Sequence, residues 1–242
     1  MKSLVLFLLI IHLAFGQEKL TINCGFQQPE ATLITNVLKS IFHEANIGLT
    51  VQILPNKRSL VNANNGTNDG DATRIWNINK YYPNLVRVPL RTHHIDIVAL
   101  TNKKHHIKSF EDLKPFNVGV VRGMKITEVK VAAIKPQSLS KISDYGQLLR
   151  MLKTGRIDVI ITDKTSLLNE IKKRRITSLF LVKKPLLVLP LYIHLHKKNQ
   201  HFIPRLTKAI ETLNKTNTLT KIENTFFNDL EKETRHLVKL IE

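Results

Sequence analysis

A repeated alternation of strand-like and helix-like segments constrains the fold of this chain most. Residues 19–26 alternate apolar with polar side chains, which indicates a strand, and residues 30–45 carry apolar side chains at helical spacing. A strand at 49–55, a polar helix at 56–66 and a short strand at 71–75 follow. This order predicts an α/β domain built around a largely parallel sheet.

The same alternation begins again near Ser109. A strand at 117–123 ends in a glycine turn, and an amphipathic helix at 144–155 is followed by a strand at 156–163 and a helix at 164–175. A second α/β unit is therefore predicted after the first.

Two long extended segments lie between these units, at 94–104 and 185–196, and we expect them to cross from one unit to the other. Beyond them the C-terminus is predicted to be helical, with apolar stripes at 203–213 and 222–230. The layout is two α/β lobes with the second inserted into the first. The predicted bounds are 17–102 and 191–242 for lobe 1, and 103–190 for lobe 2.

The first sixteen residues have the pattern of a secretory signal peptide. Met1 and Lys2 form a basic end, an apolar run follows, and Ala14 and Gly16 supply small residues before a cleavage point at Gln17. The alternative is an uncleaved anchor. We expect a periplasmic or secreted protein that does not span a membrane after cleavage, because no other segment approaches eighteen consecutive apolar residues.

The chain is strongly basic, with 37 Lys and Arg against 19 Asp and Glu. Such a charge favours anionic partners. However, the densest basic runs, 171–176 and 195–201, have no interleaved aromatic residues to stack bases, so we do not expect a nucleic-acid partner. Cys24 is the only cysteine, which excludes an intrachain disulfide and predicts a buried structural thiol.

No enzyme, metal or cofactor site is predicted. The chain has no G-x-S-x-G elbow, no P-loop and no H-E-x-x-H motif, and Cys24 lies within a strand rather than at a helix start. His194 and His196 share one face of a strand, but no cysteine or glutamate stands near them at the spacing that zinc requires.

Five segments carry a resemblance to a known family, and they cover most of the chain in the right order. They are the glycine- and aspartate-containing block Arg58–Arg74, then Tyr82–Pro89, Ser109–Gly123, Leu148–Asp163 and Pro190–Leu213. With these segments the chain resembles the family 3 periplasmic solute-binding proteins, the amino-acid-binding type attached to ABC transporters.

The resemblance implies the type II periplasmic binding fold, a clamshell with a two-strand hinge. It also implies a monomer that captures a small polar solute, an amino acid or related carboxylate, in the cleft between the lobes. The solute would then pass to an inner-membrane permease or be reported to a sensor. The alternative is an exported basic interaction protein with the same fold, which binds an anionic polymer or a protein partner.

Two charged residues are the main binding candidates. Arg74 follows a helix stop at Gly66 and a short strand, and its guanidinium fork suits a carboxylate; the alternative is a solvated surface arginine. In the family the corresponding arginine lies further on, after a threonine-containing turn. Asp163 stands where the family places an acceptor for the ligand ammonium; the alternative is an N-cap for the helix that begins at Lys164.

Five further residues complete the predicted site. Backbone N–H groups at Gly123 and Met124 could bind an anionic group at a helix start, with Arg122 adding charge; a tight turn is the other interpretation. Phe26 is expected either against the ligand or in the core. Arg58 is expected to face either the cleft or solvent.

Overall fold

A computed structural model describes residues 18–242 of the chain, so the predicted signal peptide at 1–16 lies outside the described residues. The strands are β1 (Lys19–Cys24), β2 (Gly48–Ile53), β3 (Gly70–Arg74), β4 (Leu85–Arg87), β5 (His93–Thr101), β6 (Asn117–Val121), β7 (Ser138–Ile142), β8 (Val159–Asp163), β9 (Leu179–Val182), β10 (Leu187–His196) and β11 (Val238–Ile241). The helices are α1 (Glu30–Glu44), α2 (Asn56–Asn64), α3 (Lys125–Ile134), α4 (Tyr145–Lys153), α5 (Lys164–Arg174), α6 (Ile203–Lys215) and α7 (Thr218–Thr234), with short 3-10 helices at Ile78–Lys80, Glu111–Leu113 and Lys197–Phe202.

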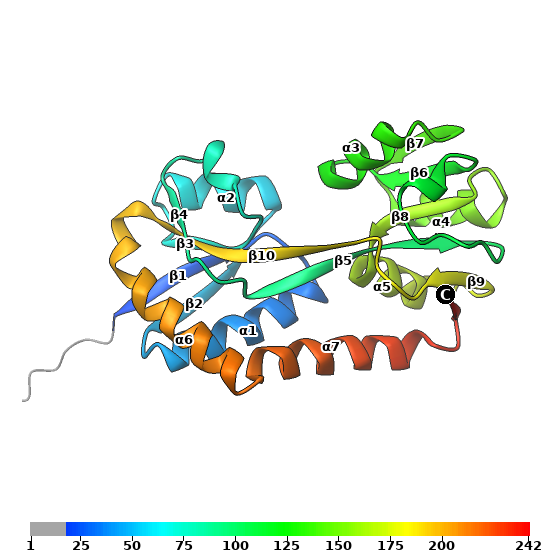
Figure 1. Ribbon diagram of the computed structural model, residues 1–242. Helices are drawn as coiled ribbons and strands as arrows, with labels where there is room; N and C mark the ends of the chain where they lie inside the picture. The colour runs from blue at the N-terminus through cyan, green and yellow to red at the C-terminus, as the bar shows by residue number, and fades with distance from the viewer. Residues whose placement is uncertain (1–17) are drawn as a thin grey trace, which may run out of the picture.

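The elements form two lobes joined by β5 and β10 (Figure 1). One sheet runs through both lobes in the order β2-β1-β3-β10-β5-β8-β6-β7. Strands β1, β2 and β3 are parallel in the first lobe, and β6, β7 and β8 are parallel in the second. The two joining strands are antiparallel to each other and to their neighbours. The predicted α/β fold and its two crossing segments are confirmed.

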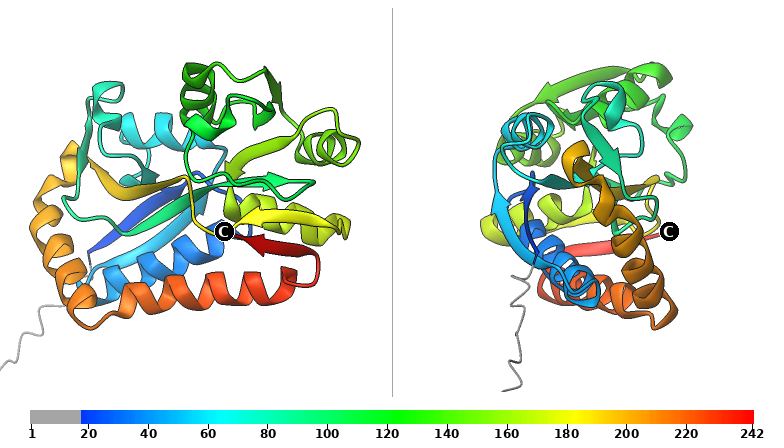
Figure 2. Two further views of the ribbon diagram at one scale, coloured as in Figure 1. Left: turned by 45° about the vertical axis from the view of Figure 1, so that its right-hand side comes forward. Right: turned by 90° about the vertical axis from the view of Figure 1, so that its left-hand side faces the viewer.

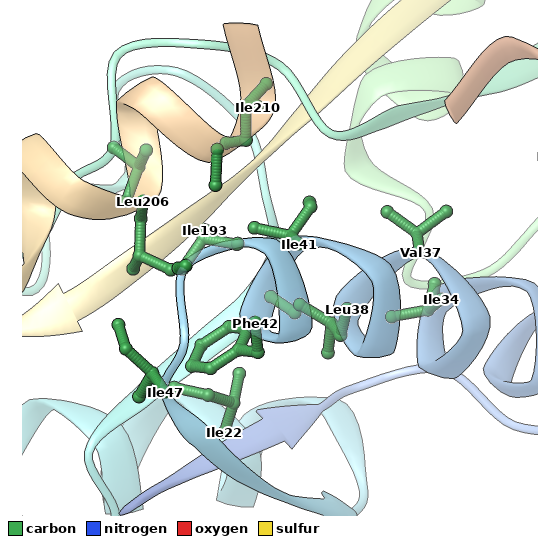
Figure 3. Packing of buried hydrophobic residues seen from close by; sticks show 14 of the residues in the cluster. Ile22, Ile34, Val37, Leu38, Ile41, Phe42, Ile47, Ile193, Leu206 and Ile210 are labelled. Carbon is green, nitrogen blue, oxygen red and sulfur yellow. The ribbon is translucent and has the colours of Figure 1, made fainter. Parts of the chain in front are cut away.

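The core of the first lobe forms because α1 carries one continuous apolar stripe. The residues of this stripe are at most 1% exposed: Leu33, Ile34, Val37, Leu38, Ile41 and Phe42. Figure 3 shows labelled side chains of this stripe between Ile22 of β1 on one side and Ile193 of β10 with Leu206 and Ile210 of α6 on the other. Full burial of one such side chain contributes roughly 1.5–3 kcal/mol.

The core of the second lobe lies on both faces of β8. Ile160 packs in the cluster that contains the α4 and α5 leucines, whereas Val159 and Ile161 pack with Val118 and Val120 of β6 on the opposite face. This division follows the two-residue period of a strand. A strand that is buried on both faces has a continuous apolar run in its sequence, and this run predicts β8.

The C-terminal segment forms the two predicted helices, α6 and α7, but its end lies with the second lobe. Helix α7 runs beneath both lobes and packs against α1 and α5 (Figures 1 and 2). The chain then ends in a strand rather than a helix, because β11 pairs in parallel with β9 of the second lobe. The sequence had assigned the whole of 191–242 to the first lobe.

For α3 the sequence predicts only a helix start near Gly123 and Met124, without its extent, and it does not predict β7. Helix α3 has a weak apolar stripe, since only Thr127, Glu128 and Val131 are buried, and no residue of β7 is fully buried. Within residues 18–242, no helix combines the length and the apolar character needed to cross a membrane.

Candidate functional site

A cavity of about 710 Å³ lies between the two lobes. It is bounded by the segments that follow β1, β3 and β6, so it lies at the carboxyl ends of parallel strands, where open α/β sheets bind ligands. The lining residues are Phe26, Asn56, Leu60 and Thr73–Ile78 from the first lobe, Val121 and Gly123–Ile126 from the second, and Ile95 and Leu189–Leu191 from the crossing strands.

Most of this lining is apolar, and part of it is exposed. Trp76, the only tryptophan in the chain, is 52% exposed, and its neighbour Ile75 is also exposed. The guanidinium carbon of Arg87 lies 3.0 Å from the Trp76 ring centre, and the Tyr192 ring meets the indole edge-on at 5.3 Å. Large apolar side chains that face a concave space mark a binding surface.

Arg74 ends β3 and lines the cavity, yet it is only 5% exposed. Its Nη2 donates to Oδ2 of Asp71 at 2.7 Å, and its Nη1 donates to Oδ1 of Asn56 at 2.5 Å. Its Nε is buried without a hydrogen-bond partner among the described residues. The guanidinium packs over Gly25, where any Cβ atom would overlap Nη2. Arg74 is therefore held by the first lobe rather than extended into solvent.

Asp71 is the centre of the cluster that holds Arg74. Its side chain is fully buried and accepts hydrogen bonds from the Ser59 hydroxyl and, at 3.0 Å each, from the backbone N–H and the hydroxyl of Thr73. The Thr73 hydroxyl in turn accepts from the Gly25 N–H at 3.3 Å. The positive charge of Arg74 is thus matched by a carboxylate that the surrounding residues fix in place.

Asp163 lies outside the lining of the cavity. One carboxylate oxygen accepts from the Ser166 N–H at 2.7 Å and caps α5, and the other accepts from the Tyr145 hydroxyl at 2.7 Å. Burial raises the pKa of the Tyr145 phenol above its usual range, so the hydroxyl stays protonated and donates. The N-cap stated as the alternative for Asp163 is present.

The turn after β6 forms the wall on the second lobe. Gly123 and Met124 line the cavity, and Gly123 has a φ of +92°, which favours glycine. The Gly123 N–H donates to Oε1 of Glu128 at 2.6 Å, and Lys125 lies 3.3 Å from the other oxygen of that carboxylate. The Gly123 N–H bond is the main cause that lowers the pKa of Glu128. The Gly123 N–H, predicted to bind an anionic group of a ligand, therefore already donates to a carboxylate of the protein.

Comparison with known proteins decides the fold. No protein-family model matches the chain, and no curated protein matches it. A probable amino-acid ABC transporter extracellular-binding protein from Bacillus subtilis aligns with a TM-score of 0.71 at 14% identity, covering 86% of this chain and 97% of that one. An ancestral arginine-binding protein bound to arginine gives 0.64 at 21% identity, covering 87% and 99%. The GluR0 ligand-binding core with L-glutamate gives 0.68 at 12% identity, covering 90% and 99%.

The chain has the periplasmic binding fold. The cavity described above is the space between the two lobes of that fold. Of the residues predicted for the site, four line this cavity: Phe26, Arg74, Gly123 and Met124. Phe26 also packs against the core of the first lobe, which was the alternative stated for it.

Three predicted residues do not line the cavity of this periplasmic binding fold. Arg58 and Arg122 are exposed on the surface, and Asp163 caps α5. Arg122 donates to the Lys141 carbonyl at 2.8 Å. The sequence reasoning missed Trp76, although a lone tryptophan directly after a predicted strand end was a usable signal.

The single cysteine and the metal-binding side-chain types are the remaining sequence candidates. Cys24 is fully buried, and this burial raises the pKa of its thiol to about 11, so the predicted structural thiol is confirmed. No group of three or more His, Cys, Asp or Glu side chains in residues 18–242 is arranged to hold a metal ion.

Proposed function

We propose that this protein is an exported solute-binding protein of the family 3 type, which captures a small solute between its lobes and performs no catalysis. The observation that carries the proposal is the cavity of about 710 Å³, which both lobes and both crossing strands line. Its volume lies in the range of small-molecule sites, roughly 300–1,000 Å³. The exposed Trp76 gives one wall a large apolar surface that a solute can cover.

Capture would work by closure of the lobes about β5 and β10. Trp76 and Ile75 stand on the wall of the first lobe, and Met124 and Ile126 stand on the wall of the second. A solute that contacts both walls favours the closed form by the contacts that it makes only there. Closure then removes the solute and both walls from water. The protein would deliver the solute to a membrane permease or report it to a sensor.

Intrinsic fluorescence tests this function directly. Trp76 is the only tryptophan, so any change in its emission reports the cavity. We expect a screen of amino acids, small carboxylates, neutral amides and polyamines to find a compound that shifts this emission and raises the melting temperature. At a concentration about 100 times its Kd, such a compound stabilises the protein by about 2.7 kcal/mol.

A matched pair of variants, one just before α3 and one within it, makes the screen specific. Met124→Asp places a charge in the cavity lining, whereas Val129→Asp places the same charge on an exposed position of α3 outside the lining. The first should lose the response to the compound and the second should keep it. A flat response of the wild-type protein, freed of co-purified ligand, would overturn the proposal, as would an undiminished response of Met124→Asp.

The alternative, binding of an anionic polymer, rests on the net charge of +18. Two cations of the densest basic run already have partners, since Lys172 lies 2.7 Å from a Glu233 oxygen and Arg174 lies 2.9 Å from a Glu170 oxygen. Salt separates the two functions. Binding of a polyanion at the surface weakens steeply as salt rises, whereas binding of a solute enclosed between the lobes weakens far less.

A further inference from the structure

Both charged groups of the cavity lining that could bind the carboxylate of a solute already lie beside a carboxylate of the protein. Arg74 and Lys125 are the charged residues among the lining residues that the structure describes. Asp71 neutralises Arg74 at 2.7 Å, and Glu128 lies 3.3 Å from the Lys125 ammonium, which is itself 81% exposed. A carboxylate on a solute would therefore have to compete with a carboxylate of the protein.

The competitor at Arg74 cannot easily move away. Asp71 lies within β3, is fully buried, and accepts from Ser59 and twice from Thr73 in addition to Arg74. Displacing it would leave a buried carboxylate without its cation, which costs far more than breaking a solvated ion pair. The pair Asp71–Arg74 therefore presents no net charge to the cavity.

An ammonium group would find no anionic partner either. The described lining contains no aspartate and no glutamate, and Asp163 is committed to capping α5 and to the Tyr145 hydroxyl. A zwitterionic solute would lose water from both of its charges, and the one cation left for its carboxylate is the exposed Lys125, a solvated charge beside Glu128 that contributes little. The neutral polar groups of the lining are the side chains of Asn56, Thr73 and Asn77.

We propose that the cavity selects an uncharged solute with an apolar body and one neutral polar group, such as an amide, and that Asp71 sets this selection by neutralising Arg74. The proposal rests on the proposed function, because it presupposes that the cavity captures a solute. The apolar body would lie against Trp76 and Met124, and the polar group would hydrogen-bond to the neutral side chains of the lining. This replaces the carboxylate-bearing solute that the sequence suggested.

A charge series on one molecular body tests the selection. We would measure, by calorimetry and by Trp76 emission, the binding of 3-phenylpropionamide, 3-phenylpropionate, L-phenylalanine amide and L-phenylalanine, and of the corresponding compounds with an isobutyl body. The neutral amide should bind tighter than each charged member by about tenfold or more, because only the charged members lose the hydration of a charge without gaining a buried counter-charge.

The variant Asp71→Asn tests the residue assigned to the selection. Asparagine keeps the shape and, through its single oxygen, the acceptor for Thr73, but it removes the charge that neutralises Arg74 and places an amide NH2 where the other oxygen accepted from Ser59 and Arg74. The ratio of anion affinity to amide affinity should rise by about tenfold or more. Asp163→Asn is the matched control, since it neutralises an equally buried carboxylate outside the lining and should leave that ratio unchanged.

The outcomes separate this inference from the proposed function. Tighter binding of the anion or the zwitterion by the wild-type protein overturns the inference and leaves solute capture standing. An unchanged ratio in folded Asp71→Asn removes the role of Asp71. Failure of every neutral and charged compound in the screen removes solute capture, and this inference with it. The wild-type series decides the charge preference even where Asp71→Asn does not fold.

Discussion

The two walls of the cavity hold similar backbone turns by different means. On the first lobe, the segment after β3 is fixed by Asp71 and Arg74, a pair almost completely removed from water. On the second lobe, the turn after β6 is fixed by Glu128, whose partners Lys125 and Lys141 are largely solvated. Buried charges are costly to leave unpaired, whereas solvated pairs contribute little. Substitutions in the first wall should therefore lower the stability of the protein strongly, and substitutions in the second wall should lower it little.

Removing the central carboxylate of the first wall should give the largest effect. Asp71→Ala leaves the Arg74 guanidinium buried without its counter-ion and leaves Ser59 without its acceptor. We expect a loss of about 3–5 kcal/mol in the free energy of unfolding, measured by urea denaturation. A loss below about 1 kcal/mol would mean that water reaches Arg74 and that the two walls do not differ in this respect.

A buried histidine should make the first wall sensitive to acid. His194 of β10 lies opposite Asp71 of β3, is fully buried, and burial lowers its pKa from 6.5 to about 4. Between these two values the unfolded chain binds a proton that the folded chain does not. Stability therefore falls as the pH drops from about 6.5 toward 4, and this residue should remove about 1–2 kcal/mol between pH 7 and pH 5.

The variant His194→Gln isolates this residue from other buried groups. His93 is also buried, with a pKa of about 4, and should remain as a second acid-sensitive group in the variant. Burial raises the pKa of Glu30 well above its usual value, so Glu30 has the opposite effect on the pH dependence. Urea denaturation of both proteins at pH 7 and pH 5 gives the difference. If the wild-type protein and His194→Gln lose the same free energy of unfolding between pH 7 and pH 5, His194 is not the acid-sensitive group.

Sequence reasoning reached the framework of the first wall because its signals are local. The apolar stripe of α1 is predicted from its helical spacing. Phe26 lies just after β1 and Arg74 is the last residue of β3, and ligands of such sheets lie at these strand ends. The pairing of Arg74 with Asp71 was not predicted from the sequence. Residues three apart on a regular strand point to opposite faces, so a pair between Asp71 and Arg74 is not expected from spacing alone. The structure brings them together at the end of β3, beside an irregularity in the pairing with β10.

The elements that the sequence did not reveal depend on distant partners. Strand β11 pairs with β9, which lies more than fifty residues earlier in the chain. No local sequence pattern predicts that pairing. Glu128 is likewise not among the residues that the sequence singles out. Its bond to the Gly123 N–H depends on the left-handed turn at that glycine. The sequence therefore placed an anion where the protein places its own carboxylate.

A substitution in the second wall should lower the stability of the protein least, and added salt should remove this loss. Glu128→Gln keeps an acceptor for the Gly123 N–H but removes the attraction to Lys125 at 3.3 Å and to Lys141 at 3.9 Å. These ammonium groups are solvated, so added ions screen the attraction; the Debye length is about 10 Å at 0.1 M salt and about 3 Å at 1 M. We expect a small loss of stability at low salt that disappears near 1 M NaCl. The loss in Asp71→Ala should persist at both salt concentrations, because its pair is buried. Equal salt dependence of the two variants would show that both walls are held by solvated charges.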